Sequence, residues 1–384
     1  MNVLLTLSSA SVTGPADRLL GDARLLVAAG HAVTVAHDTR REGTLAPAIE
    51  AAGFARAAEL ALCREVRPLE LARDVRRLRA RLRDVDLVHA HFSHDHHVAL
   101  LAAAGLRHKV RLIRSAENEA NLRPGFGRGL AYRRSDGIEV ATKERAERLV
   151  ATFGLDPARI AALPGAVDAE RFSPGEAPSR LRATLGVPPE VPLFGIVARV
   201  KPDRRHADLV AALALARPDA PELRIAVIGR GEGEPALRAE VERLGLGRSV
   251  LFAGYWAGDD LVEAYRGLDA AVWLAEGNDG SCRGVLEAMA VGLPVIAGNE
   301  GASSEIVEEG KTGLLVAPGD VSALAAALTR LAKEPRERRA LGEAGRARVR
   351  DRYVWRERGR ALLELYERIR ELPPVGRAFR RRGG

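Results

Sequence analysis

The chain has 384 residues, of which 59 are basic and 51 acidic, so its formal net charge is +8. Because domains commonly hold about 100 to 200 residues, this length predicts two compact domains. Apolar residues make up 47% of the chain and are spread along it, which excludes global disorder. Most basic residues are arginines close to acids, as on a solvated surface, and aromatic residues are only 4%, which argues against a nucleic-acid-binding module.

Cysteine content and apolar patterning indicate the compartment. Cys63 and Cys282 are too few for a disulfide framework and lack metal-ligand spacing. No uninterrupted apolar run reaches the roughly 18 residues that a membrane-spanning helix needs, and the N-terminus lacks the pattern of a secretion signal. We therefore expect a cytoplasmic protein, either free or peripheral on the inner face of the cell membrane.

Short apolar segments rich in β-branched residues alternate with amphipathic helical segments, such as residues 19–30 and 69–82. This alternation predicts right-handed βαβ units and parallel sheets buried on both faces. In the first half, strands are predicted at residues 3–7, 31–36, 86–91, 110–115, 137–142 and 160–163. In the second half, strands are predicted at residues 193–200, 223–229, 250–254, 270–275, 294–297 and 313–316.

A proline-rich break interrupts this pattern at residues 168–192, with room for one short helix at 179–185. The break predicts two doubly wound, Rossmann-like α/β domains, residues 1–172 and 173–353, that face each other across a ligand cleft. A last helix is expected at about residues 354–372, followed by a basic tail at 373–384.

The most informative segment, EGNDGSCRGVLEAMAVG at residues 276–292, places a small-residue loop between a strand and a helix. Backbone amides and the positive helix end at such a junction favour a phosphate or diphosphate. Glu287 lies about one turn further along, which suits a ribose, and Asp279 at the loop apex is placed to meet hydroxyls of the group that the diphosphate carries. Alternatively, Glu287 is a surface helix residue and Asp279 a turn former. The other candidate donor-binding residues of this junction are Gly280, Ser281, Cys282 and Arg283.

With the sequence LPVIAGNEGASSEIVEEGKTGLLVAPGD that follows it, this segment resembles the signature of family 4 glycosyltransferases, which are retaining enzymes of the GT-B fold. Further segments resemble the same family in order: PGAVDAERFSP, GIVARVKPDRRHADLVAA, and AVIGRGEGEPALRAEVERLGL followed by VLFAGY. The resemblance implies that the first domain presents the acceptor and the second binds a nucleoside diphosphate sugar, with no cofactor and no required metal. It also implies that the last helix crosses back to the first domain.

The resemblance assigns roles to individual residues. It places Glu287 on the ribose and Asp279 on the transferred sugar, where the family usually has the longer glutamate. Arg199 falls on the family's phosphate-binding arginine, and Arg204 replaces its lysine. Two fixed cations would stabilise the charge that builds on a leaving diphosphate, although a solvated loop is the alternative for both. Gly229 and Tyr255 fall in the nucleotide-facing segments and complete the donor site.

Two positions of the first domain belong to the same pattern. Gly14 matches the family's N-terminal glycine-rich loop, which approaches the diphosphate and the sugar. Glu117, assigned here to the catalytic site, stands where the family generally has a histidine near the reacting carbon. Either a changed sugar specificity or a loss of activity follows from that replacement.

The run HAHFSHDHH at residues 89–97 contains five histidines. His89 and His91 should point to the same side of a strand end, and the later histidines are predicted on a loop between strand and helix. His91 and His94 are candidate acceptor contacts. A zinc site and ordinary polar residues at a strand end are the alternatives.

The predicted function is therefore transfer of a sugar from a UDP-, GDP- or ADP-sugar to a hydroxyl of a glycan, lipid-linked or small-molecule acceptor, in cell-envelope polysaccharide or glycolipid synthesis. A nucleotide-sugar epimerase of the same fold and an inactive relative are the alternatives. A dinucleotide oxidoreductase is disfavoured because Glu234 stands where its fingerprint needs glycine. If the acceptor is a membrane glycolipid, we hypothesise that Arg377 and the tail residues 380–382 contact anionic lipid.

Overall fold

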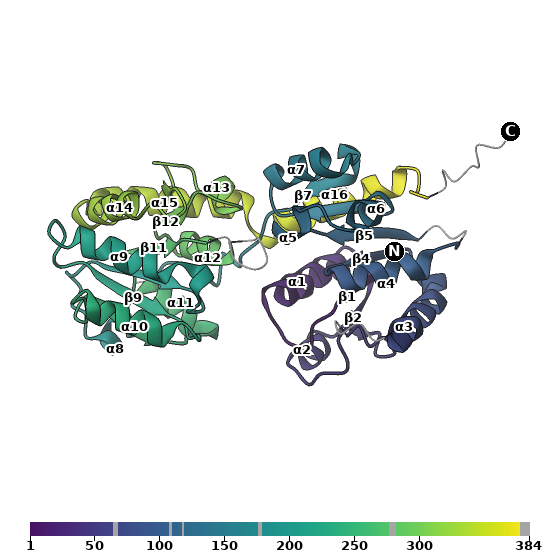
Figure 1. Cartoon of the computed structure of the whole chain (residues 1–384), viewed down its shortest axis with the longest axis horizontal. Coiled ribbons are helices and arrows are strands. Elements are labelled where there is room, and N and C mark those ends of the chain that lie inside the picture. Colours follow the sequence, from purple (N-terminus) through teal and green to yellow (C-terminus); the bar gives the residue numbers. More distant parts are fainter. Residues whose placement is uncertain (64–67, 107–109, 117–118, 176–178, 276–281, 377–384) are drawn as a thin grey trace. The chain divides into compact units, whose positions relative to one another are not determined.

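The computed structural model describes residues 1–63, 68–106, 110–116, 119–175, 179–275 and 282–376. The chain forms two compact units (Figure 1). The first unit consists of Met1–Pro164 together with the chain from Trp355 onward, and the second of Gly165–Val354. The chain therefore passes from one unit to the other twice.

Within the described residues, the first unit contains a seven-stranded sheet in the order β3-β2-β1-β4-β5-β6-β7, and every neighbouring pair is parallel. The direction of winding reverses between β1 and β4, so the switch point of the sheet lies between these two strands. The strands are β1 (Asn2–Leu7), β2 (Ala32–His37), β3 (Ala55–Arg56), β4 (Leu87–Ala90), β5 (Arg111–Ser115), β6 (Gly137–Val140) and β7 (Ile160–Ala162).

The second unit repeats this plan with a six-stranded, wholly parallel sheet over the part of the chain that is described, in the order β10-β9-β8-β11-β12-β13. Its switch point lies between β8 and β11. The strands are β8 (Leu193–Val197), β9 (Arg224–Ile228), β10 (Val250–Gly254), β11 (Ala270–Trp273), β12 (Val295–Gly298) and β13 (Gly313–Val316).

Helices cover the faces of both sheets (Figure 1). In the first unit they are α1 (Gly14–Ala28), α2 (Leu45–Ala51), α3 (Pro68–Arg81), α4 (Ser93–Ala103), α5 (Glu119–Leu122), α6 (Arg128–Arg133), α7 (Lys143–Phe153) and α16 (Trp355–Glu371), with the 3-10 turns η1 (Leu82–Asp84) and η2 (Pro157–Arg159). In the second unit they are α8 (Arg180–Leu185), α9 (His206–Ala216), α10 (Glu234–Arg243), α11 (Gly258–Arg266), α12 (Arg283–Val291), α13 (Ser303–Ile306), α14 (Val321–Lys333) and α15 (Pro335–Arg352), with the 3-10 turn η3 (Pro202–Arg204).

Alternating side chains of each strand of the second sheet build two cores, one on each face. Ile225 and Val227 of β9 pack with α9, α10 and α14, whereas Ala226 and Ile228 pack with α11 and α12. Such strands, buried on both faces, are typical of a parallel sheet between helical layers. The predicted α/β fold with two doubly wound sheets is confirmed.

The connection between the units is not the proline-rich break predicted at residues 168–192. Phe172 and Val187 are 3% and 8% exposed and pack in the core of the second unit. Val167 pairs in parallel with Val354, and Ser179 caps α8 by accepting a hydrogen bond from the amide of Leu181. Because these contacts bury the segment, the chain leaves the first unit after Pro164 rather than after residue 172.

The C-terminal helix α16 belongs to the first unit, where it packs on α1 (Figure 1). Its buried side chains Leu362, Leu365, Tyr366 and Ile369 join the core formed by β1, β2 and α1. Over the part of the chain that the structure describes, no helix combines the length and apolar character needed to cross a membrane.

Candidate active site

The carboxyl edge of the second sheet collects most of the predicted donor-binding residues. Because all its strands are parallel, the loops that follow them emerge at this one edge. Arg199 and Arg204 follow β8, Gly229 follows β9, and Tyr255 follows β10. The helix that carries Glu287 begins beyond β11. Asp279, Gly280 and Ser281 lie outside the described residues.

Glu287 is a buried residue of α12, not a surface residue. It is the fifth residue of the helix, and it is 4% exposed. Burial of a carboxylate is costly unless hydrogen bonds compensate for the lost water. The alternative interpretation of Glu287 as a solvated helix residue is therefore wrong.

Among the described residues, the side chains of Tyr265 and Arg283 hold the Glu287 carboxylate. The Tyr265 hydroxyl of α11 donates to Oε2 at 3.0 Å, and Nε of Arg283 donates to Oε1 at 2.6 Å. Burial, followed by the charge of Glu287, raises the pKa of Tyr265 well above its ordinary value, so the phenol remains a donor. Each carboxylate oxygen accepts more than one hydrogen bond, so the group retains capacity for the hydroxyls of a ligand.

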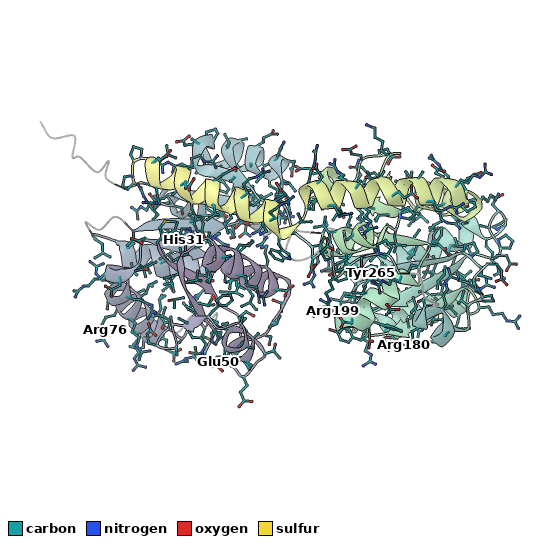
Figure 2. The ribbon with its side chains drawn as sticks, turned by 180° about the vertical axis from the view of Figure 1, so that it is seen from behind. His31, Glu50, Arg76, Arg180, Arg199 and Tyr265 are labelled. Atoms are coloured by element: carbon teal, nitrogen blue, oxygen red, sulfur yellow. The ribbon has the colours of Figure 1, made fainter. Side chains whose placement is uncertain are left out.

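Tyr265 and Arg283 differ in exposure to solvent. Tyr265 is 1% exposed, and its ring contacts that of Phe172 edge-on at 6.1 Å between centroids, so its hydroxyl is fixed (Figure 2). The side chain of Arg283 is 42% exposed. An exposed guanidinium at the first turn of a helix can turn toward a bound anion, whereas the buried tyrosine remains on the carboxylate.

The residue before α12 adopts a left-handed backbone conformation. Cys282 has φ 47° and ψ 44°, and its side chain is fully buried. Such a conformation costs about 1 kcal/mol or more for a residue other than glycine, and it is retained where the surrounding packing imposes it. The thiol therefore packs in the core of the second unit.

The predicted phosphate-binding arginines share one loop between β8 and α9. Arg199 is exposed, and Figure 2 shows it at the surface of the second unit. The side chain of Arg204, in η3, is 12% exposed and lies 3.3 Å from Asp203. Arg205 follows with a left-handed backbone, φ 59°, and ends the turn before α9 begins. The structure thus brings both cations to one short loop but exposes them unequally.

A buried imidazole lies directly after this loop. His206, the first residue of α9, is 3% exposed. Burial, with the neighbouring Arg204 guanidinium, lowers the pKa of His206 to about 4. His206 is therefore neutral at physiological pH and adds no further positive charge to the loop. The sequence offered no signal for its burial.

Glycines let two loops of this edge approach each other closely. A Cβ placed on Gly229 would lie 2.0 Å from the carbonyl oxygen of Ala198, and one on Gly231 would lie 2.1 Å from that of Val200. Real Cβ atoms do not come this close to backbone oxygens, so both positions require glycine. Gly229 and Gly231 therefore let the loop after β9 lie directly against the loop that carries Arg199.

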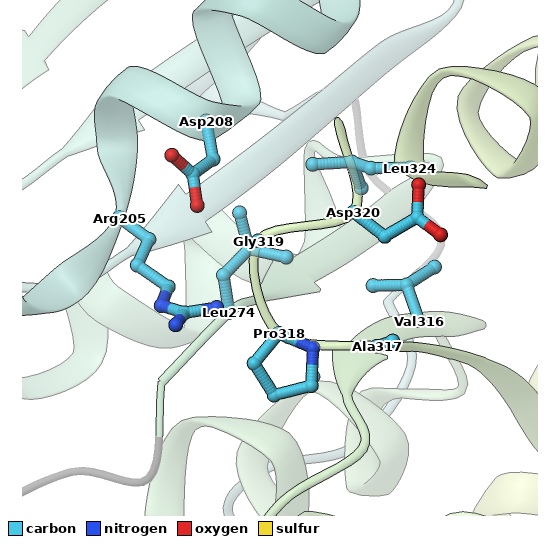
Figure 3. A pocket seen from close by; sticks show the side chains of 10 residues that line it. Arg205, Asp208, Leu274, Val316, Ala317, Pro318, Gly319, Asp320 and Leu324 are labelled. Atoms are coloured by element: carbon cyan, nitrogen blue, oxygen red, sulfur yellow. The ribbon is translucent and has the colours of Figure 1, made fainter. Parts of the chain in front are cut away.

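A small hollow lies at the same edge, on the side of α9 and α14 (Figure 3). It encloses about 220 Å³, including space open to solvent. Arg205 and Asp208 line it from α9 and the residue before it, and Leu274, Gly298 and Val316 line it from the ends of β11, β12 and β13. Tyr255, the predicted donor contact after β10, is 68% exposed and lies outside this lining.

In the first unit the predicted residues are distributed differently. Gly14 is the first residue of α1, and Glu117 lies outside the described residues. His94, predicted on a loop, instead lies in α4, which begins at Ser93. The helix starts early because the Asp95 carboxylate accepts hydrogen bonds from the amides of Phe92 and Ser8.

His91 is 1% exposed, and its ring stacks on that of His89 at 4.6 Å between centroids, so the two side chains lie on one side as predicted. Its Nδ1 lies 3.2 Å from the carbonyl oxygen of Thr6, whereas its Nε2 has no hydrogen-bond partner among the described residues. Burial, then the neighbouring His89, lowers the pKa of His91 well below its ordinary value. In the described chain, no group of three or more His, Cys, Asp and Glu side chains is arranged to hold a metal ion.

A buried charge network, which no local sequence pattern indicates, joins α16 to the first sheet. Arg358 donates to both oxygens of Asp22 at 2.6 and 2.7 Å, and to Glu139 at 2.8 Å. Glu139 also meets His89 at 3.1 Å, and the Tyr366 hydroxyl lies 2.9 Å from the other nitrogen of His89. Burial alone raises the pKa of Glu139, but Arg358 and the His89 hydrogen bond outweigh it and hold this pKa well below its ordinary value.

Comparison with known protein families gives two consecutive matches along the chain. The family described as "Glycosyltransferase Family 4" matches residues 21–171, and the family described as "Glycosyl transferases group 1" matches residues 179–348. A D-inositol 3-phosphate glycosyltransferase from Actinosynnema mirum is 31% identical over 312 residues, which cover 75% of this chain and 73% of that protein. The chain belongs to glycosyltransferase family 4.

Other relatives of this family 4 chain are matched over shorter parts of their length. A D-inositol 3-phosphate glycosyltransferase from Streptomyces bingchenggensis is 30% identical, over 73% of this chain and 66% of the relative. A GDP-mannose-dependent alpha-(1-6)-phosphatidylinositol monomannoside mannosyltransferase from Mycolicibacterium smegmatis is 31% identical, over 62% of this chain and 63% of the relative. The chain thus spans less than two thirds of the length of these two proteins.

Solved structures confirm the GT-B fold of the family 4 chain. A glycosyltransferase from Rickettsia africae has a TM-score of 0.82 at 18% identity, over 97% of this chain and 99% of that chain. HepE of Anabaena, solved in complex with UDP, has a TM-score of 0.82 at 19% identity, over 96% of this chain and 100% of that chain. At these identities the likeness concerns the fold.

Proposed function

We propose that the protein is a retaining glycosyltransferase that moves a sugar from a nucleoside diphosphate sugar to a hydroxyl acceptor. The observation that carries this proposal is the buried Glu287 carboxylate, which Tyr265 holds at the carboxyl edge of a doubly wound sheet. A buried acid one turn inside a helix at such an edge suits the two hydroxyls of a ribose. Membership of family 4 supports the same assignment.

The other proposed donor-site residues would each contact a different part of the nucleoside diphosphate sugar. Arg199 and Arg204 would meet the diphosphate, with help from the exposed guanidinium of Arg283. Tyr255, 68% exposed beyond β10, is suited to stacking on the base. Asp279 is proposed to contact the transferred sugar, on the resemblance alone.

The same residues suggest how the reaction would proceed. As the bond between the sugar and the diphosphate breaks, negative charge gathers on the leaving phosphate oxygens. Arginines held on a short loop stabilise this charge without a change in their own protonation, because a guanidinium stays charged. The protein needs no metal for this step in our proposal, and retention of configuration at the sugar carbon follows the family resemblance.

Relatives narrow the substrates that are worth testing. One relative is named for GDP-mannose, several for D-inositol 3-phosphate, and HepE was solved with UDP. We propose a UDP- or GDP-sugar as donor and a polyol or glycolipid hydroxyl as acceptor, in the synthesis of cell-envelope glycans or glycolipids. The protein would act in the cytoplasm or at the inner face of the membrane, with the basic tail at residues 377–384 as one contact.

Isothermal titration calorimetry with UDP and GDP tests the donor site. Glu287→Ala should abolish measurable nucleotide binding, because a ribose would lose both hydrogen bonds to the carboxylate. Glu242→Ala changes a carboxylate on α10, outside the proposed site, and should leave the affinity unchanged. Asp279→Ala should keep nucleotide affinity but lose transfer. If Glu287→Ala turns over normally, the site assignment is wrong.

Product analysis decides between transfer and the alternatives. Glu117 departs from the family's usual histidine, so an inactive nucleotide-sugar-binding relative is the second candidate. Incubation with a nucleotide sugar and an inositol or glycolipid acceptor should release the free nucleoside diphosphate together with a glycosylated acceptor. Release of a rearranged donor sugar would indicate an epimerase, and tight nucleotide binding without products would indicate the inactive relative.

A further inference from the structure

An aromatic side chain stands fully exposed at the loop that leads into α6. Phe126 has a relative exposure of 112%, and Leu130, one turn into α6, is 48% exposed. Phe126 lies between two glycines, and Gly127 has φ 70°, a left-handed turn conformation that favours glycine. A large apolar ring kept in water costs free energy unless a partner covers it.

Hydrogen bonds hold this loop in a defined shape. The amide of Arg128 donates to the carbonyl oxygen of Gly125 at 3.1 Å, and the amide of Ala131 donates to that of Gly127 at 2.9 Å. The Arg128 guanidinium also donates to the carbonyl oxygen of Arg123. The loop therefore presents the ring of Phe126 at its tip rather than folding it back onto the first unit.

Arg123, Arg128 and Arg134 lie within eight residues of Phe126 in the sequence. We call Arg123, Phe126, Arg128, Leu130 and Arg134 the Phe126 patch. Leu130 and Arg134 are four residues apart and so share one side of the chain at α6. Among the described residues, no ion pair within 4.0 Å joins any of its three arginines to a carboxylate. On the neighbouring α7, by contrast, Arg148 pairs with both Glu119 and Glu144.

We infer that the Phe126 patch docks the first unit onto an anionic lipid bilayer. An exposed aromatic ring with arginines near it in sequence fits a membrane interface, where the ring enters the boundary of the acyl chains and the guanidinium groups meet lipid phosphates. The inference rests on the proposed function in one respect: a membrane lipid as acceptor would give the docking its purpose. One relative is named for a phosphatidylinositol monomannoside.

A nucleic-acid partner fits this patch less well. Single-stranded nucleic acid is bound by several aromatic rings along a basic groove, and the Phe126 patch has one ring. The mixture of an aliphatic side chain, one phenyl ring and basic groups is what a lipid surface accommodates. Attachment at such a patch is peripheral and reversible, and it is weakened by salt.

Co-sedimentation of the full-length protein with vesicles tests the inference. The wild type should sediment with phosphatidylcholine vesicles that contain about one third phosphatidylglycerol, and not with phosphatidylcholine alone, at about 50 mM salt. Arg123→Gln with Arg134→Gln should weaken partitioning about 25-fold, at roughly fivefold per arginine. Phe126→Ser should weaken it about tenfold.

Matched controls separate this patch from general charge and from the tail. Arg336→Gln with Arg339→Gln removes two charges from α15, and Leu215→Ser removes an exposed leucine from α9. Both controls should bind vesicles as the wild type does. The inference is overturned if the patch variants also bind like the wild type, or if only neutralising residues 380–382 of the tail releases the protein.

A second readout keeps the docking distinct from the donor site. The rise in melting temperature with UDP or GDP should be the same in the wild type and in the patch variants, since Phe126 lies in the first unit. Absence of a nucleotide shift in every protein would contradict the proposed function while leaving vesicle binding as a separate result. Loss of the shift in Phe126→Ser alone would place Phe126 in the donor site and overturn the docking.

Discussion

The two units share one strand order but finish the carboxyl edges of their sheets in different ways. In the first unit, His89, Glu139 and Arg358 are buried there and bonded to one another. In the second unit, Arg199 and Tyr255 are exposed, and the buried acid Glu287 accepts hydrogen bonds from Tyr265 and from the exposed Arg283. Strand order therefore determines where polar groups collect. Their hydrogen-bond partners determine whether these groups stabilise the fold or can contact a ligand.

Removing the central cation of the first unit should have the largest effect on stability. Arg358→Met leaves the carboxylates of Asp22 and Glu139 buried without the guanidinium that bonds to both, and such a loss costs about 3 to 5 kcal/mol. We expect urea denaturation to show this decrease in the free energy of unfolding. Arg356→Met, on a side chain that is 81% exposed, is the control and should cost less than about 1 kcal/mol. Equal losses in the two variants would show that the buried network around Arg358 adds no stability beyond that of a surface arginine.

Closing the gap between two loops of the second unit should have the next largest effect. In Gly231→Ala, the new Cβ would lie 2.1 Å from the carbonyl oxygen of Val200, so the loops must separate, at a cost of roughly 2 to 3 kcal/mol. Gly245→Ala places a Cβ in open space and should cost about 1 kcal/mol for its left-handed backbone. Thermal unfolding measures both. A smaller loss at Gly231 than at Gly245 would contradict the close approach.

A matched pair of tyrosine variants distinguishes the candidate ligand site of the second unit from the buried network of the first. Tyr265→Phe removes the hydroxyl that holds Glu287, and Tyr366→Phe removes the one beside His89. Each should lower stability by about 1 to 2 kcal/mol, because a buried hydrogen bond is lost. Only Tyr265→Phe should weaken nucleotide binding, about tenfold by calorimetry, because it frees the carboxylate to rotate. Equal nucleotide affinities would show that Tyr265 serves the fold alone.

Acid should destabilise the second unit through His206, the smallest effect of the four. Its pKa is about 4 in the folded protein, against an ordinary value of 6.5, so the unfolded chain binds a proton more readily between these values. The free energy of unfolding should therefore fall as pH drops below about 6.5, with His206 contributing on the order of 1 to 2 kcal/mol at pH 5. Denaturation of His206→Gln should show a shallower pH dependence. An unchanged slope would contradict this assignment.

Periodicity predicted most of the fold because most strands are buried on both faces. The segments at 250–254 and 313–316 begin and end as observed in β10 and β13. The two-residue strand β3 was missed, since Ala55 and Arg56 carry no apolar pattern. His94 was placed on a loop because Asp95, which starts α4 early, was not recognised as a helix-capping residue.

The candidate site was predictable only where residues close together in the sequence form a motif. The sequence around Glu287 predicted a ribose contact, although the burial of Glu287 and its hydrogen bond from Tyr265 became visible only in the structure. The pair of Asp22 and Arg358 lies 336 residues apart in sequence, so no local pattern reveals it. Arg358 also lies on an amphipathic helix rich in charged residues, where an arginine is ordinarily assigned to the solvated face.

The double crossing between units has a consequence for the order in which the protein is made. The second unit, Gly165–Val354, is complete before the helix that finishes the first unit leaves the ribosome. At about 5 to 20 residues per second, roughly 10 to 40 s pass between synthesis of Pro164 and the end of α16. During that interval Asp22 and Glu139 lack their guanidinium partner, and the first unit lacks its last helix while the second unit can already fold.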